Sequence, residues 1–359
     1  MGSVSRRRAL SISAAIAEVV ACGFGATGAD VMARDRGEDD SGDRRVDVHH
    51  HFTPPQWLDW AEARGLVIRG VLPWWTRWDL DSALRAMDSA GIETAVVTAA
   101  TPVPRYADTG QHRESLIVAY AAMVDVVARA PGRFAFFAPL PLDDLELASW
   151  SARYGRDAGA VGMNAMTHNS TGVYLGDPVF DSLLAELDSG PTVINLHPTE
   201  LPGSSPLAPA LPGVPSFLCD YPLDITRAAV NMTVHRTLDR FPNLSFILPH
   251  GGGFLPYITS RFGSSGGYLV PAVEPERVED YLRRFYYDTA APMSPASTPT
   301  LLAVTDPARI LYGSDWPAAN TDLVAAAASA LDADSALTIG HRLDINRHNA
   351  FRLFPQLRS

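Results

Sequence analysis

The sequence contains no lysine, because all 29 of its basic residues are arginine. Lysine is needed for Schiff-base catalysis and for the phosphate-binding P-loop. It is also needed for metal centres that are bridged by a carbamylated lysine. The absence therefore excludes three widespread kinds of active site.

Positive charge and cysteine are scarce as well. The 29 arginines stand against 40 acidic residues, so the formal net charge is −11 and no basic stripe is left for a nucleic acid. The two cysteines, Cys22 and Cys219, lie far apart and imply no disulfide framework. Beyond the N-terminal region, no apolar run approaches the length of a transmembrane helix.

The first 45 residues are typical of an export signal and a tether. SRRRAL at residues 5–10 is similar to a twin-arginine signal, and a weakly apolar stretch follows it. VVAC at residues 19–22 loosely fits a lipoprotein cleavage box, which would make Cys22 a lipid anchor, and residues 31–33 form a rival cleavage site. The composition of residues 23–45 predicts a disordered tether. We expect twin-arginine export; a disordered extension of a cytoplasmic protein is the alternative.

Residues 46–359 alternate short apolar runs with amphipathic stretches, a pattern that indicates βα units and a parallel sheet. Eight strands are predicted, at residues 46–48, 94–97, 134–137, 160–163, 192–196, 244–248, 285–287 and 310–312. Helices are predicted at residues 79–90, 114–130, 178–188 and 226–240, with a final helix at 340–354 packed on the barrel. Eight such units predict one α/β domain, a (β/α)8 TIM barrel.

Two long insertions interrupt this alternation. Residues 53–78 follow the first strand and hold five of the seven tryptophans, and residues 200–222 follow the fifth strand. Both would leave the C-terminal ends of strands, where barrel enzymes build substrate pockets. The tryptophans either contact substrate or only cover the barrel mouth, and Trp78 is our candidate for a substrate contact.

The motif Asp47-Val48-His49-His50-His51 is the strongest chemical signal. Alternate residues of a strand face the same side, so His49 and His51 project together while His50 points away and is structural. At the end of the first strand, both imidazoles could reach a metal at the barrel mouth. A chance histidine run is the alternative interpretation.

Three further motifs end the predicted strands five, six and eight. His197 closes the fifth strand, His250 precedes three glycines after the sixth, and Asp315 follows the eighth. A lone histidine at a strand end is usually structural, but imidazole and carboxylate groups there also suit metal ligands or general bases. Five such side chains at one end of one barrel predict an active site.

Beyond these residues, the sequence resembles the amidohydrolase-related family that contains aminocarboxymuconate-semialdehyde, 6-methylsalicylate and resorcylate-type decarboxylases. The resemblance covers about residues 46–355. Within the family, the sequence looks most like the 6-methylsalicylate decarboxylase branch. The segments that carry it are RFAFFAPLPLDD (133–144), GVYLGDPVFDSLLAEL (172–187), VINLHPT (193–199), DITRAAVNMTVHRTLDRFPNLSFILPHGGGFLPY (224–257) and RILYGSDWP (309–317).

The resemblance implies a metal centre with one divalent ion, bound by His49, His51, His197 and Asp315. His250 would sit beside the metal-bound water and act as acid or base. A single-metal site agrees with the absence of lysine. Zinc suits a set of three histidines and one aspartate, and manganese is the alternative.

The resemblance also implies how substrate is bound. Arg261 matches a family arginine that binds the substrate carboxylate, in some members across a dimer interface, so a homodimer is expected. The family's other carboxylate-binding arginine has no secure counterpart in this chain. Its candidates are Arg69, Arg77 and Arg105.

The function we expect is the non-oxidative decarboxylation of an aromatic or unsaturated carboxylic acid, a small molecule. His250 and Asp315 would handle the proton that replaces the carboxylate. The alternative keeps the site but hydrolyses a lactone, amide or ester, with Asp315 as general base. A binding protein without activity is a third hypothesis, which the intact ligand positions disfavour. No dinucleotide-binding fingerprint follows the first strand.

Overall fold

The short apolar runs of the sequence form eight parallel strands. The computed structural model describes residues 44–99, 104–205, 210–290 and 296–358. Each strand pairs with the next one along the chain, in the order β1 to β8. The strands are β1 (Arg45–His51), β2 (Ile92–Thr98), β3 (Phe134–Leu140), β4 (Gly162–Met166), β5 (Thr192–His197), β6 (Leu244–Leu248), β7 (Tyr286–Asp288) and β8 (Ile310–Leu311).

Backbone hydrogen bonds between β1 and the segment after β8 complete the ring. The amides of Val48 and His51 donate to the carbonyls of Tyr312 and Trp316, at 3.0 and 2.7 Å. The amide of Asp315 donates to the carbonyl of His49 at 2.9 Å. The predicted (β/α)8 barrel is therefore confirmed.

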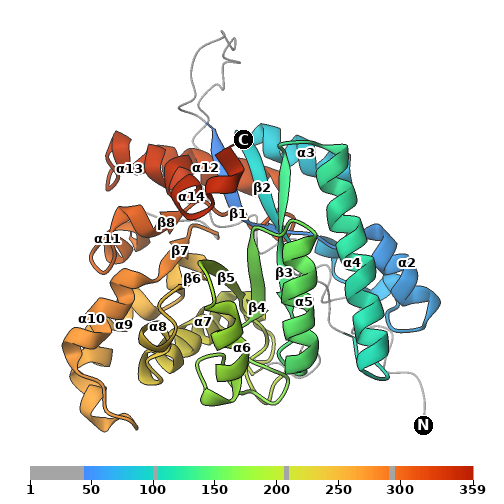
Figure 1. Cartoon of the computed structure of the whole chain (residues 1–359). Coiled ribbons are helices and arrows are strands. Elements are labelled where there is room, and N and C mark those ends of the chain that lie inside the picture. Colours follow the sequence, from blue (N-terminus) through green and yellow to red (C-terminus); the bar gives the residue numbers. More distant parts are fainter. Residues whose placement is uncertain (1–43, 100–103, 206–209, 291–295, 359) are drawn as a thin grey trace. The chain divides into compact units, whose positions relative to one another are not determined.

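Helices surround the strands (Figure 1). Several begin where a side chain accepts a hydrogen bond from a backbone amide of the first turn, as Asp79, Asp108, Asp144 and Asn320 do. The helices are α2 (Pro55–Ala63), α3 (Leu80–Ser89), α4 (Thr109–Arg129), α5 (Leu145–Asp157), α6 (Asp181–Leu187), α7 (Ser216–Val234), α8 (Thr237–Arg240), α9 (Leu255–Ser265), α10 (Pro275–Arg284), α11 (Ser297–Leu302), α12 (Thr321–Asp332), α13 (Ile339–Leu343) and α14 (Asn349–Leu353). Within the described residues, every helix is too short or too polar to span a lipid bilayer.

The helical boundaries differ from the prediction mainly around residues 200–240. The predicted helix at 226–240 is divided into α7 and α8 by Arg236, whose backbone is left-handed with φ 52°. Helix α7 begins at Ser216, inside the predicted insertion, and contains Pro222. Proline and glycine in this region predicted a loop, but burial of one side of α7 against the barrel outweighs that local preference.

The C-terminal helix packs on the barrel as predicted. It consists of α13, a π-helical turn at Asp344–His348 and α14. Phe354 follows α14 and joins the small apolar cluster inside the barrel, with its ring 5.8 Å from that of Phe137. Arg347 donates to Glu93 near the start of β2, so this helix closes the end of the barrel where the strands begin.

An irregularity in β1 determines which side chains enter the barrel. Val46 and Val48 belong to the interior cluster. Between Asp47 and His50, β1 then has one residue more than the facing part of β2, from Ala95 to Val97. This bulge reverses the alternation, so His49 follows Val48 into the interior while Asp47 and His50 lie on the outer side.

All described residues belong to one compact unit, Gly42–Ser359. Arg45 is already the first residue of β1 and pairs with Asp332 of α12. Residues 1–43, which include Cys22 and the predicted export signal, lie outside the described part of the chain.

Candidate metal centre

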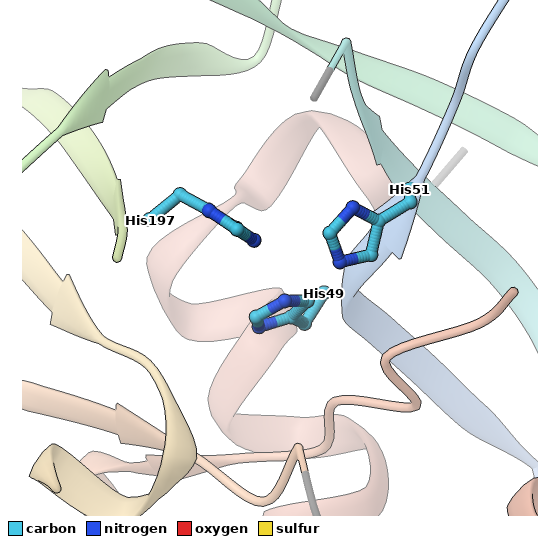
Figure 2. A group of neighbouring side chains, drawn as sticks. All are labelled: His49, His51 and His197. Atoms are coloured by element: carbon cyan, nitrogen blue, oxygen red, sulfur yellow. The ribbon is translucent and has the colours of Figure 1, made fainter. Parts of the chain in front are cut away.

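Three histidines meet at the mouth of the barrel. His49 and His51 come from β1, and His197 is the last residue of β5. One ring nitrogen of each lies within 4.8 Å of those of the other two. Figure 2 shows the three rings directed toward one another. The structure thus brings together three of the predicted metal ligands.

Asp315 completes this group. Its Oδ1 lies 2.8 Å from Nε2 of His51 and 3.3 Å from Nε2 of His49. Asp315 has a left-handed backbone with φ 61°, one of three non-glycine residues in the described chain with positive φ. Another is His250, so two of the three lie at this site. Uncommon backbone conformations of this kind concentrate at functional sites.

His250 lies beside the ligand group. Its ring centre is 5.1 Å from that of His49, and its Nδ1 is 3.0 Å from the carbonyl oxygen of Ala290. A carbonyl oxygen only accepts, so Nδ1 carries the proton and Nε2 remains the nitrogen that can exchange one. The predicted acid or base is thus held in one tautomer.

Asp288, at the end of β7, is a site residue that the sequence analysis missed. Its Oδ2 lies 2.8 Å from Nδ1 of His49, and its Oδ1 accepts hydrogen bonds from the amides of His250 and Ala290, at 2.8 and 3.0 Å. A carboxylate on the outer nitrogen of a histidine directs the other nitrogen to a metal. Its position at the end of a predicted strand was the signal that could have revealed it.

Asp47 and His50 support the site from the outer side of β1. Asp47 accepts from the amides of His49 and Ser314, at 3.0 and 2.9 Å, and from the hydroxyl of Ser314 at 2.6 Å. Nδ1 of His50 lies 2.9 Å from Asp47, and its buried ring packs against Trp316. His50 is therefore structural, as its position in the strand predicted.

The ionisation of the site suits a divalent cation. Burial lowers the pKa of His51 and, with the neighbouring imidazoles, holds the pKa of His197 well below its usual value. Burial raises the pKa of Asp315, but hydrogen bonds from His49 and His51 outweigh it and hold that pKa well below its usual range. Burial also lowers the pKa of His49, yet Asp288 and Asp315 outweigh it and raise that pKa well above its usual value. The two carboxylates therefore favour positive charge at His49.

The residues fit a single metal ion. Nδ1 of His49 is held by Asp288, so its buried Nε2 is directed into the ligand group and lies 3.3 Å from Asp315. His197 has Nδ1 2.7 Å from the carbonyl oxygen of Pro198, so its Nε2 also presents a lone pair. Neutral imidazole nitrogens and one ionised carboxylate are a donor set that zinc, manganese and iron accept.

The predicted substrate contacts lie elsewhere. Trp78 is buried against Phe52 and Phe134, on the outer side of the strands, and is not brought to the histidines. The tryptophan that faces them is Trp75, whose ring centre is 6.0 Å from that of His51. The local pattern could not distinguish these two residues, because their environments depend on how α2 and α3 pack on the barrel.

The arginines named from the sequence are all exposed. Arg261 lies on α9, and no hydrogen bond or ion pair of its guanidinium is found among the described residues. Arg69 pairs with Asp59 and Glu62 on the surface. Arg77 and Arg105 are exposed as well. Among the described residues, none of the four forms a hydrogen bond or ion pair with the ligand group.

The sequence and the fold of this chain are similar to those of known proteins. The family model described as amidohydrolase matches residues 46–356. The chain is 31% identical over 332 residues to a 6-methylsalicylic acid decarboxylase of Aspergillus aculeatus, covering 88% of this chain and 97% of that protein.

Two solved structures share the fold. A 2,6-dihydroxybenzoate decarboxylase, crystallised with 2,6-dihydroxybenzoate, has a TM-score of 0.72 and 25% identity, over 88% of this chain and 99% of the other. A dihydroxybenzoic acid decarboxylase from Polaromonas, with bound manganese and the inhibitor 2-nitroresorcinol, has a TM-score of 0.74 and 23% identity, over 88% and 98%.

Proposed function

The chain belongs to the amidohydrolase family, and from that membership we propose that it catalyses the metal-dependent, non-oxidative decarboxylation of an aromatic carboxylic acid. The observation that carries the proposal is the convergence of His49, His51, His197 and Asp315 in the barrel mouth. Relatives with named activities, such as the 6-methylsalicylic acid decarboxylase, act on hydroxylated aromatic acids.

The four ligands would hold one divalent ion, which supplies Lewis-acid polarisation of a substrate oxygen when bound. His250 delivers a proton to the ring carbon that carries the carboxylate. The bond between that carbon and the carboxylate then breaks, its electron pair restores the aromatic ring, and carbon dioxide leaves. Nδ1 of His250 is held by Ala290, so the proton passes through Nε2.

The metal is zinc or manganese in this proposal. Three imidazoles and one carboxylate suit zinc, while manganese is present in one solved relative of the same fold. Metal analysis of the protein purified without added metal distinguishes the two, together with reconstitution of the stripped protein by each ion in turn.

In a homodimer, Arg261 would reach the site of the partner subunit. Tyr257 and Tyr268, near Arg261 along the chain, and Val270 expose 86%, 90% and 91% of their surface, and an apolar surface of this kind favours burial by a second copy. Arg261 would then bind the substrate carboxylate in the partner's barrel, and Trp75 rather than Trp78 would contact the ring.

Mixed dimers test this arrangement. His250→Asn and Arg261→Ala homodimers are both expected to be inactive. If Arg261 acts across the interface, one site of a mixed dimer keeps both intact residues, so mixing the variants restores activity. Mixtures that stay inactive, or a monomer by light scattering, would contradict it.

The N-terminal segment is proposed to export the folded enzyme by the twin-arginine route, with Cys22 as a lipid anchor. Replacing Arg6, Arg7 and Arg8 by lysine should then retain the protein in the cytoplasm. Cys22→Ser should release it from the membrane fraction. An unchanged distribution in both variants would favour the cytoplasmic alternative.

A substrate panel tests the reaction itself. Hydroxybenzoates, lactones, amides and esters are incubated with the metal-loaded protein while carbon dioxide release is recorded. We expect carbon dioxide from a hydroxybenzoate and none from the metal-stripped enzyme. Turnover of lactones, amides or esters alone would replace the decarboxylase by the hydrolase alternative.

A further inference from the structure

The ligand His197 has no carboxylate on its outer nitrogen, in contrast to His49. Its Nδ1 lies 2.7 Å from the carbonyl oxygen of Pro198, the next residue along the chain. That carbonyl belongs to the peptide group that joins Pro198 to Thr199. The position of the His197 ring therefore depends on what holds this peptide group in place.

Asp224 of α7 holds the other side of the same peptide group. Its Oδ2 accepts the Thr199 amide at 3.1 Å. The amide hydrogen and the carbonyl oxygen of a trans peptide point in opposite directions. The Pro198–Thr199 peptide thus lies between the Asp224 carboxylate on one side and the His197 imidazole on the other.

Asp224 also reaches His197 by a second route. It accepts a hydrogen bond from the hydroxyl of Thr167, the residue that follows β4. The amide of Thr167 in turn donates to the carbonyl oxygen of His197 at 3.1 Å. The backbone on both sides of the His197 ring is therefore tied to one side chain of α7.

Three donors surround the Asp224 carboxylate, an arrangement that its ionised form satisfies. The side chain is fully buried, and the hydroxyl of Tyr174 donates to its Oδ1 at 2.8 Å. Burial leaves the pKa of Asp224 above its usual value, although hydrogen bonds from Thr167, Thr199 and Tyr174 oppose that rise. His168 has Nε2 3.6 Å from Oδ1, and its two ring nitrogens also lie at the carbonyl oxygens of Asn169 and Glu200.

We propose that Asp224 is a positioning residue of the metal centre, which orients and polarises the ligand His197 through the Pro198–Thr199 peptide. A negative charge on the amide side of a peptide makes its carbonyl oxygen a better acceptor. The carbonyl then fixes the proton on Nδ1 of His197 and strengthens Nε2 as a donor to the metal. Asp288 acts on His49 directly, whereas Asp224 acts on His197 through one peptide; the inference rests on the metal centre of the proposed function.

The test compares Asp224→Asn with Tyr174→Phe. Asparagine keeps an oxygen for the Thr199 amide and can turn its amino group toward Tyr174, but it removes the charge. Tyr174→Phe removes one hydrogen bond from Asp224 and leaves the Thr199 contact intact. The dissociation constant of Zn²⁺ is measured on each apoprotein by competition with a chromophoric chelator, and the apoprotein melting temperature is recorded beside it.

Asp224→Asn should weaken Zn²⁺ binding by about 10-fold or more, in the range found for residues that support metal ligands. Tyr174→Phe should stay within about 2-fold of the wild type. Wild-type affinity in Asp224→Asn would overturn the inference, and so would an equal loss in both variants, since that would show only a shared effect on packing.

Hydrogen exchange on the wild type gives a second test that needs no variant. The Thr199 amide should be strongly protected, because its proton is held by a buried carboxylate. Exchange at the rate of an exposed amide would overturn the inference. A wild type that binds no Zn²⁺ would overturn the metal centre as well, whereas failure of decarboxylation alone would leave the affinity comparison valid.

Discussion

Replacing Asp288 by asparagine should remove His49 from the metal centre while leaving the fold in place. The Asp288 side chain is fully buried, and its two oxygens have different tasks. Oδ1 accepts the amides of His250 and Ala290, and Oδ2 faces Nδ1 of His49 at 2.8 Å. Asparagine has almost the same shape but only one acceptor oxygen.

The single oxygen of asparagine should stay with the two backbone amides, because these can only donate. The amino group then points at Nδ1 of His49, which must become the acceptor. The ring proton therefore moves to Nε2, the nitrogen that faces Asp315 and the metal position. A protonated Nε2 cannot bind a metal, so the centre keeps three of its four ligands.

The expected loss is about 10- to 100-fold in metal affinity, the range found for supporting residues of metal ligands. This corresponds to about 1.4 to 2.8 kcal/mol of binding free energy. Chelator competition on the apoprotein measures it, and a melting curve checks that the apoprotein still folds.

Asp332→Asn is the matched control for this experiment. Asp332 pairs with Arg45 at the start of β1 and accepts from Asn346 at 3.2 Å, near the end of the barrel away from the mouth. This variant should keep wild-type metal affinity. If Asp288→Asn bound Zn²⁺ as tightly as the wild type, the tautomer argument for His49 would be refuted.

Three further predictions concern other parts of the molecule. His250→Asn should lower kcat at least about 100-fold while metal content by mass spectrometry is unchanged; loss of metal would make His250 a ligand. Asp144→Ala should cost α5 about 1 kcal/mol at neutral pH, measured by urea unfolding. The Leu147 amide and the Thr109 hydroxyl lower the pKa of Asp144, so its contribution is present above about pH 3.9 and lost as pH falls through the depressed pKa; a constant difference down to pH 2 would contradict this. Gly253→Ala should cost at least about 2 kcal/mol, because Gly253 has φ 65° and a Cβ there would lie 2.0 Å from a carbonyl oxygen of α7, whereas Gly190→Ala, with open space around it, should stay within about 0.5 kcal/mol.

The strands were largely predictable because barrel strands are buried on both faces and show as short apolar runs. The sixth strand has the bounds that were predicted for it. The first was predicted at residues 46–48, but β1 begins one residue earlier, at Arg45, and continues three residues further, to His51. In the sequence, the polar histidines end the apolar run of the first strand. In the folded chain they remain in the ladder, because the backbone pairs with β2 whatever the side chain is.

The supporting residues were not predictable in the same way. Asp288 and Asp224 lie 239 and 27 positions from the ligands His49 and His197 that they support. Their contacts depend on the closure of the barrel and on the packing of α7, which no local pattern encodes. The same dependence on packing explains why Trp75, and not the predicted Trp78, lies near the histidines.

The sequence by itself determined the kind of chemistry available. Without lysine, and with imidazole and carboxylate groups at strand ends, it indicated one metal ion in the mouth of an α/β barrel. Strand alternation showed that His49 and His51 face the same side. Alternation alone could not show that this side is the barrel interior. Val46 and Val48, which are one position out of phase with the two histidines, already face the interior. Only the tertiary structure decided this: the extra residue between Asp47 and His50 turns both histidines inward, since the register with β2 must be kept on either side of it.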